Sequence, residues 1–174
     1  QTKFGNYIFE GKYYYWIYQV ITQEDSMDEL TRIYQEKNGS VESPNGANPF
    51  YSINLKLIDY HDEKKEDFLF IQPHRMGNSW FFIEGLKIKV DGGIKKWNWE
   101  SWNRKSEIVP ISNLLLEWAY LPITRKELEE LINSKTISAR IIGDTAYADL
   151  PIMEYVQDNW KKFYNDYVKD SNVR

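Results

Sequence analysis

Hydrophobic and polar positions alternate along the middle of the chain, and this alternation predicts β-strands. Ile53, Leu55 and Leu57 are separated by polar residues, and Leu86 and Ile88 are separated by a lysine. A period of two places one side of each strand in the core and the other side towards solvent. Further strand-like runs bounded by turn residues span 68–72, 80–83, 108–111, 114–120, 136–142 and 146–150.

The N-terminal region has a different strand pattern, because large residues occupy both faces. Aromatic and β-branched side chains dominate 7–22, and both types favour a pleated sheet. We predict one long strand there, or two strands broken at Gly11. The Tyr-rich stretch 13–18 is then explained by core packing or by cross-strand pairing.

Three segments carry helix signals. Residues 26–29 and 124–127 each have the spacing of a capping box, which predicts short helices over 26–39 and 124–133. From Pro151, a residue suited to a first helical turn, apolar residues recur at spacings of three and four. This stripe predicts an amphipathic C-terminal helix. Its members are Met153, Val156, Trp160, Phe163 and Tyr167.

These elements predict a single β-rich domain over residues 1–174, of the α+β class. We expect mainly antiparallel sheet, with about eight strands bent into a sandwich or an open barrel. The C-terminal amphipathic helix should pack on the sheet, and the two short helices should lie at its edges. A chain of 174 residues fits one domain without metals or disulfides to hold it.

Composition and charge exclude several classes of protein. With 7 Trp, 13 Tyr, 8 Phe and no Cys, the chain is too aromatic for a disordered tail and has no disulfide, thiolate nucleophile or cysteine-bound zinc. Its 22 basic and 26 acidic residues are well mixed, which argues against nucleic acid as a partner. No apolar run is long enough for a membrane span. Because the first residue is Gln1 rather than Met, we expect a secreted or periplasmic protein.

Catalytic and cofactor motifs are absent from the sequence. Neither a serine-nucleophile motif nor a phosphate-binding glycine loop occurs. We therefore expect no cofactor, no metal site and no catalytic residue. His61 and His74 both fall in predicted turns and lack the spacing of a helical zinc motif. Two solvated loop histidines explain them.

One segment stands out as a candidate binding site: Trp97, Trp99, Glu100, Trp102 and Arg104. Rigid aromatic faces beside charges suit sugar stacking or a protein-binding hot spot. Alternatively, strand alternation places these tryptophans in the core while the polar residues between them face water. Both interpretations stay open at the level of sequence.

The function we favour is a non-enzymatic, exported binding or interaction domain, with a glycan or protein ligand met by an aromatic-rich surface. One alternative is a hydrolase acting on a glycan through carboxylates, with Glu100 beside Asp59 or Glu84 and assisted by His61 or His74. A second alternative is a structural or assembly subunit, which would show a long unpaired edge strand or a large apolar patch.

Overall fold

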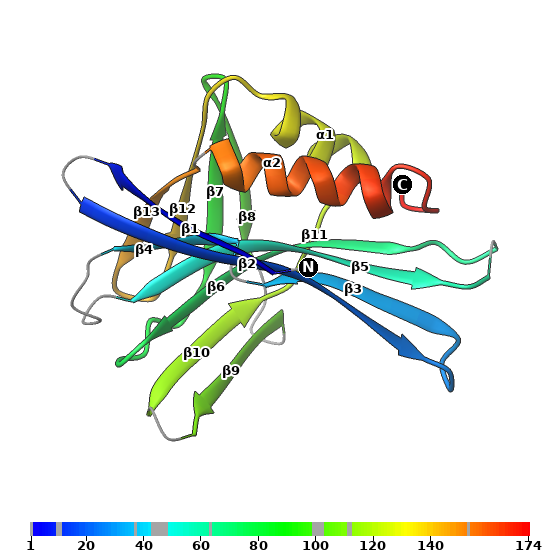
Figure 1. The fold of residues 1–174 in the computed structure, drawn as a ribbon, viewed down its shortest axis with the longest axis horizontal. Helices are drawn as coiled ribbons and strands as arrows, with labels where there is room; N and C mark the ends of the chain where they lie inside the picture. Colours follow the sequence, from blue (N-terminus) through cyan, green and yellow to red (C-terminus); the bar gives the residue numbers. More distant parts are fainter. Residues whose placement is uncertain are drawn as a thin grey trace.

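The computed structural model of the protein describes residues 2–9, 12–36, 38–42, 49–62, 64–98, 103–110, 113–152 and 154–174. Over these residues, thirteen strands form two antiparallel sheets, and two helices cover one side of the larger sheet (Figure 1). The α+β class, the antiparallel pairing and the C-terminal helix are therefore confirmed. The described residues form thirteen strands, more than the eight predicted.

The larger sheet curls into a half-barrel with strand order β1-β2-β3-β5-β6-β10-β9. Strand β4 pairs with β2 and β5, and β11 pairs with β6. The aromatic N-terminal region forms two strands, β1 and β2, rather than one long strand, so the second of the two predicted alternatives is confirmed. The strands are β1 (Thr2–Phe9), β2 (Lys12–Asp25), β3 (Leu30–Glu36), β4 (Gly39–Glu42), β5 (Phe50–Tyr60), β6 (Phe68–Gly77), β9 (Arg104–Val109), β10 (Leu114–Ala119) and β11 (Leu121–Pro122).

The smaller sheet has the order β13-β12-β7-β8. Its strands are β7 (Gly85–Val90), β8 (Gly93–Asn98), β12 (Ile137–Ile142) and β13 (Tyr147–Pro151). Asp91 and Gly92 join β7 to β8 with φ angles of 47° and 90°, as the two central residues of a type I′ hairpin turn require. The predicted hairpin over 136–150 is also confirmed, with Ala139 opposite Leu150.

The first helix, α1 (Arg125–Asn133), begins with the predicted capping box. The Thr124 hydroxyl accepts a hydrogen bond from the backbone N–H of Glu127 at 3.1 Å, and the Glu127 carboxylate accepts one from the backbone N–H of Thr124 at 2.7 Å. Each group satisfies an N–H that the helix leaves free.

The C-terminal helix consists of α2 (Glu154–Phe163) and a π-helical turn, η2 (Tyr164–Val168). It begins three residues after Pro151, which instead ends β13, an edge strand where proline is tolerated. Val156, Trp160 and Phe163 are buried as the stripe predicted. The wider π turn then brings Val168 onto the buried face, while Tyr167 packs partly buried beside the core.

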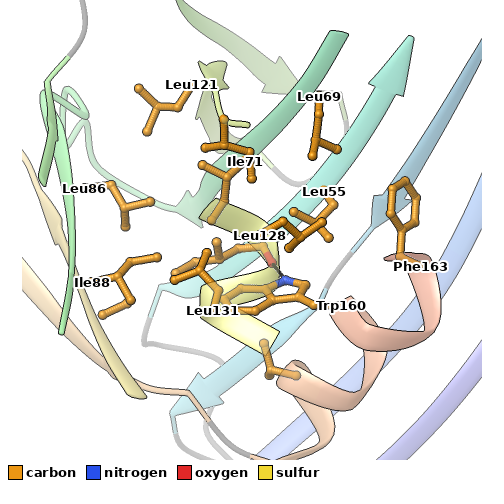
Figure 2. Packing of buried hydrophobic residues seen from close by; sticks show 14 of the residues in the cluster. Leu55, Leu69, Ile71, Leu86, Ile88, Leu121, Leu128, Leu131, Trp160 and Phe163 are labelled. Atoms are coloured by element: carbon orange, nitrogen blue, oxygen red, sulfur yellow. Dashed lines mark hydrogen bonds between the residues drawn. The ribbon is translucent and has the colours of Figure 1, made fainter. Parts of the chain in front are cut away.

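Both sheets and both helices share one hydrophobic core (Figure 2). The Trp160 ring lies at its centre, and its indole N–H donates to the backbone carbonyl of Ile53 at 3.0 Å. This bond satisfies the only polar atom of a fully buried side chain. The labelled core residues in Figure 2 are Leu55, Leu69, Ile71, Leu86, Ile88, Leu121, Leu128, Leu131, Trp160 and Phe163.

The helix predicted over 26–39 is wrong, because residues 26–29 form a turn and residues 30–36 form β3. The Asp25 carboxylate accepts the backbone N–H groups of Met27 and Asp28 at 3.2 and 3.3 Å. Glu29 has a φ of 51°, which is incompatible with a right-handed helix. Strand β3 then pairs with β2 on one side and β5 on the other. Pairing on both sides overrides the local capping signal.

Strand β6 also departs from the prediction, because it continues through Pro73 to Gly77. Pro73 lies opposite Ile53, whose N–H points away from β6 and donates to Asn38. On its other side, pairing of β6 with β10 ends at His74 and pairing with β11 resumes at Ile71. The missing N–H of proline therefore falls where neither neighbouring strand needs a donor.

Candidate functional site

Two of the five predicted site residues lie in the described part of the chain. Trp97 is in β8 and packs partly buried against the core, as the core interpretation expected for that residue. Arg104 begins β9 and lines a hollow described below. Trp99, Glu100 and Trp102 lie outside the described residues, so their role as a binding site stays a prediction.

The larger sheet has one face towards the core and helices and one face away from them, which we call the open face. Leu55 and Ile71 are fully buried on the core side, and alternation turns Lys56 and Gln72 to the open face. Lys56 lies opposite Phe70, and His74 lies opposite Trp118. Cross-strand neighbours share a face, so aromatic side chains of β6 and β10 gather on the open face.

These rings form a continuous series, which we call the aromatic row: Tyr60, Phe68, Phe70, Tyr120 and Trp118. Ring centroids are 6.2 Å apart for Tyr60–Phe68, 6.3 Å for Phe68–Phe70 and 5.9 Å for Phe70–Tyr120. The Trp118 indole N–H donates to the Tyr120 hydroxyl at 3.2 Å. The row crosses from the β5–β6 hairpin to the end of β10.

A hollow of about 310 Å³ lies at the Trp118 end of the aromatic row. Tyr34, Trp118 and Tyr120 contribute aromatic walls, and Lys56 and Gln72 contribute polar groups. The Lys56 ammonium lies 4.9 Å from the centroid of the Tyr120 ring and 5.8 Å from that of Tyr34. These cation–π contacts hold the ammonium among the rings.

His74 also lines this hollow, so its assignment to a solvated loop is wrong: it lies in β6. Its ring stacks on Trp118 with centroids 5.9 Å apart and an interplanar angle of 18°. Burial lowers the pKa of His74 to about 4, because the charged form loses hydration. The buried Nε2 atom has no hydrogen-bond partner within the described ranges. At neutral pH, His74 is an uncharged ring that supports Trp118.

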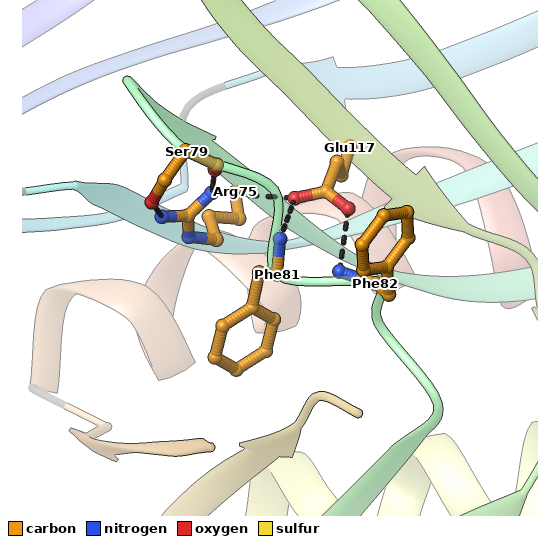
Figure 3. A network of polar contacts seen from close by, with 5 residues as sticks. All are labelled: Arg75, Ser79, Phe81, Phe82 and Glu117. Carbon is orange, nitrogen blue, oxygen red and sulfur yellow. Dashed lines mark hydrogen bonds and ion pairs between the residues drawn. The ribbon is translucent and has the colours of Figure 1, made fainter. Parts of the chain in front are cut away.

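The run 80–83 was predicted as a strand, but it is an irregular loop held by a buried ion pair (Figure 3). The Glu117 carboxylate accepts the backbone N–H groups of Phe81 and Phe82 at 2.9 and 2.7 Å. It also pairs with Arg75, whose guanidinium donates to the carbonyl and hydroxyl oxygens of Ser79. With Phe82 at a φ of 53°, the loop cannot continue as a strand.

This loop presents two aromatic rings to solvent. Trp80 and Phe82 stack with centroids 5.7 Å apart and remain 43% and 49% exposed. A second hollow of about 370 Å³ is lined by these rings together with Arg104, Lys105 and Trp118. Trp118 therefore lines both hollows, and Arg104, a predicted site residue, lies beside exposed aromatic rings.

The residues predicted for a hydrolase are spread over both sheets. Asp59 lies in β5, where burial and then the charge of Asp67 raise its pKa. Glu84 is exposed beside the smaller sheet, and its backbone N–H donates to Ile142. His61 is exposed at the β5–β6 turn and bonds to Thr31 at 2.8 Å. His74 lies roughly 20 Å further along the hairpin, and Glu100 lies outside the described residues.

Comparison of the chain with known protein families, with curated proteins and with solved structures finds no match. The helices of the described residues are too short or too polar to cross a membrane.

Proposed function

We propose that the protein is a non-enzymatic binding domain whose ligand is a glycan lying along the aromatic row. The observation that carries this proposal is the series of rings from Tyr60 to Trp118 on the sheet face that the helices leave open. A glycan ligand also fits an exported protein, which remains part of the proposal.

A glycan suits this surface because it has two kinds of group to satisfy. The C–H faces of a sugar ring stack on aromatic rings and lose water, while its hydroxyl groups need hydrogen-bond partners. The hollow supplies both, since Tyr34 and Trp118 are aromatic and Gln72, Lys56 and Glu107 are polar. From Phe68 to His74 the face extends roughly 20 Å along β6, which suits an oligosaccharide more than a single sugar.

The edge of the same sheet gives less support to the alternative that the ligand is a protein. An extended peptide usually binds by adding a strand to an exposed edge. The edge strand beside the candidate site, β9, carries Arg104, Lys105 and Glu107, and charged side chains discourage such pairing. The rings of the open face offer stacking surface instead of backbone partners.

A glycan array followed by titration of the best ligand tests the proposal. We expect the W118A variant to bind at least about tenfold more weakly, because one well-placed stacking contact contributes about 1.4 kcal/mol. The matched control is Y147A, which removes a ring 61% exposed on the other sheet and should bind as the unmodified protein does. Equal affinity of W118A and Y147A would contradict the proposal.

The segment chosen from sequence makes a separate prediction. If Trp99 and Trp102 belong to a binding surface, the double variant W99A/W102A folds normally and loses ligand. Loss of folding, seen as loss of the near-ultraviolet circular dichroism signal, would show that these side chains belong to the core.

A further inference from the structure

The outer face of the smaller sheet carries a row of cations. Leu86 and Ile88 of β7 are fully buried, so Lys87 and Lys89 face outward by alternation. Lys87 lies directly opposite Lys96 of β8 on one side and Arg140 of β12 on the other. Like charges at directly opposite positions destabilise a sheet, and this chain has a net charge of −4. The cation row is therefore a local feature that overall composition does not explain.

The charge of this row is only partly neutralised. Arg140 donates to Asp149, the next residue in the row, at 2.5 and 2.7 Å. Lys87 and Lys96 have no ion-pair partner within the described part of the chain. On the opposite side of β8, Lys95 faces α1 and pairs with Glu130 at 2.5 Å. In β8, the inward-facing Lys95 therefore has a carboxylate partner, whereas the outward-facing Lys96 has none among the described residues.

Two exposed apolar or aromatic side chains flank the cation row on the same face. Ile94 lies opposite Lys89 and is 69% exposed. Tyr147 follows on the other side of the row, with its ring centroid 4.0 Å from the Arg140 guanidinium. On this face lies a hollow of about 300 Å³, which is lined by Lys87, Lys89, Ile94, Arg140 and Asp149.

We propose that this face docks on a membrane surface rich in anionic phospholipid. The cations complement the lipid phosphates, and each basic residue near such a surface adds to the attraction. Exposed Ile94 distinguishes a membrane from a soluble polyanion, because an aliphatic side chain gains by entering the boundary of the acyl chains. Tyr147 has the amphipathic ring that favours the same interface.

Vesicle flotation tests this proposal with lipids of defined charge. We expect the protein to float with vesicles containing phosphatidylglycerol and to remain soluble with phosphatidylcholine alone. Binding should disappear in about 1 M salt, where charges more than about 3 Å apart are screened. Equal binding to both kinds of vesicle, or none to either, would overturn the proposal.

Two variants of equal net charge distinguish the effect of the cation row on vesicle binding from the effect of overall charge. K87E/K96E should reduce partitioning about tenfold or more. K161E/K169E lowers the net charge equally, but through exposed lysines at the C-terminal helix, and should bind as the unmodified protein does. Thermal melts establish that both variants fold, and K87Q/K96Q replaces the first pair if the glutamates do not fold. Equal losses in the two charge-matched variants would contradict a specific face.

The role of Ile94 distinguishes the membrane from a soluble polyanion. I94S should weaken vesicle binding several-fold while leaving its salt dependence unchanged, because the variant removes apolar surface and no charge. If the protein binds soluble polyphosphate through Lys87 and Lys96 and I94S binds vesicles as tightly as the unmodified protein, the membrane proposal is wrong.

Discussion

The carboxylate of Glu117 lies 3.2 Å from the guanidinium of Arg75, and both side chains are only 5% exposed. Each partner also holds the backbone of the 79–82 loop, Glu117 through Phe81 and Phe82 and Arg75 through Ser79. The pair therefore links β6 and β10 to the 79–82 loop (Figure 3). The buried charges are tolerated because the Glu117 carboxylate and the two terminal guanidinium nitrogens of Arg75 are all hydrogen-bonded. The Nε atom of Arg75 is buried without a hydrogen-bond partner among the described residues.

Breaking this pair should destabilise the fold strongly. We expect E117A to lower the free energy of unfolding by about 3–5 kcal/mol, because Arg75 is left as an unpaired buried charge and two backbone N–H groups lose their acceptor. Urea denaturation followed by tryptophan fluorescence measures the loss. The matched control is E107A on exposed β9, which should stay within about 0.5 kcal/mol of the unmodified protein. Similar stabilities for E117A and E107A would contradict this account.

The indole of Trp160 should be almost as sensitive to substitution. W160F removes the N–H that bonds to Ile53 and leaves a cavity beneath α2. We expect a loss of about 2–4 kcal/mol from the unsatisfied carbonyl and the lost packing. W80F, at an exposed ring, is the control and should change stability by less than about 0.5 kcal/mol. Calorimetric melting of both variants gives the comparison, and a W160F melt matching that of W80F would refute the assignment of Trp160 to the core.

His74 makes the fold sensitive to acid. Its pKa is about 4 in the folded state and about 6.5 in the unfolded state, so the unfolded chain binds more protons between these values. The contribution of His74 to the free energy of unfolding is therefore complete above about pH 6.5. This contribution, at most about 3 kcal/mol, is lost as the pH falls towards 4. Urea midpoints measured from pH 7 to 4 should fall less steeply in H74F. H61Q, at the exposed histidine, should keep the full slope, and equal slopes in all three proteins would contradict the burial of His74.

Much of the fold follows from periodicity, because strands and the last helix each bury one regular face. Alternation located β5 and β7, and the stripe from Val156 to Phe163 located α2. The failures occur where a longer-range interaction decides local structure. Hairpin pairing converts 30–36 into β3, and Glu117, 35 residues away in sequence, shapes the backbone at Phe82.

The candidate site was harder to predict than the fold, since its parts meet only through strand register. The prediction selected Trp97–Trp102 because three tryptophans lie within six residues there. The aromatic row instead joins Tyr60 and Phe68 to Trp118, which follows some fifty residues later. A signal did exist in β6: Phe68, Phe70, Gln72 and His74 alternate with the buried Leu69 and Ile71. Ending the predicted strand at Pro73 hid it, and only the pairing of β6 with β10 brings Trp118 beside His74.

The most direct test of the aromatic row is an NMR titration of the protein with soluble hexasaccharides of glucose, xylose and N-acetylglucosamine. The reporter is the indole Nε1–H of Trp118, assigned by its loss in W118A, together with the backbone amides of Phe70 and Tyr120. We predict that one of these glycans shifts the three signals saturably and with a common affinity, and that W118A weakens its binding. Saturable shifts confined to other surfaces, or no shift with any of the three glycans, would contradict the assignment of this face to glycan binding.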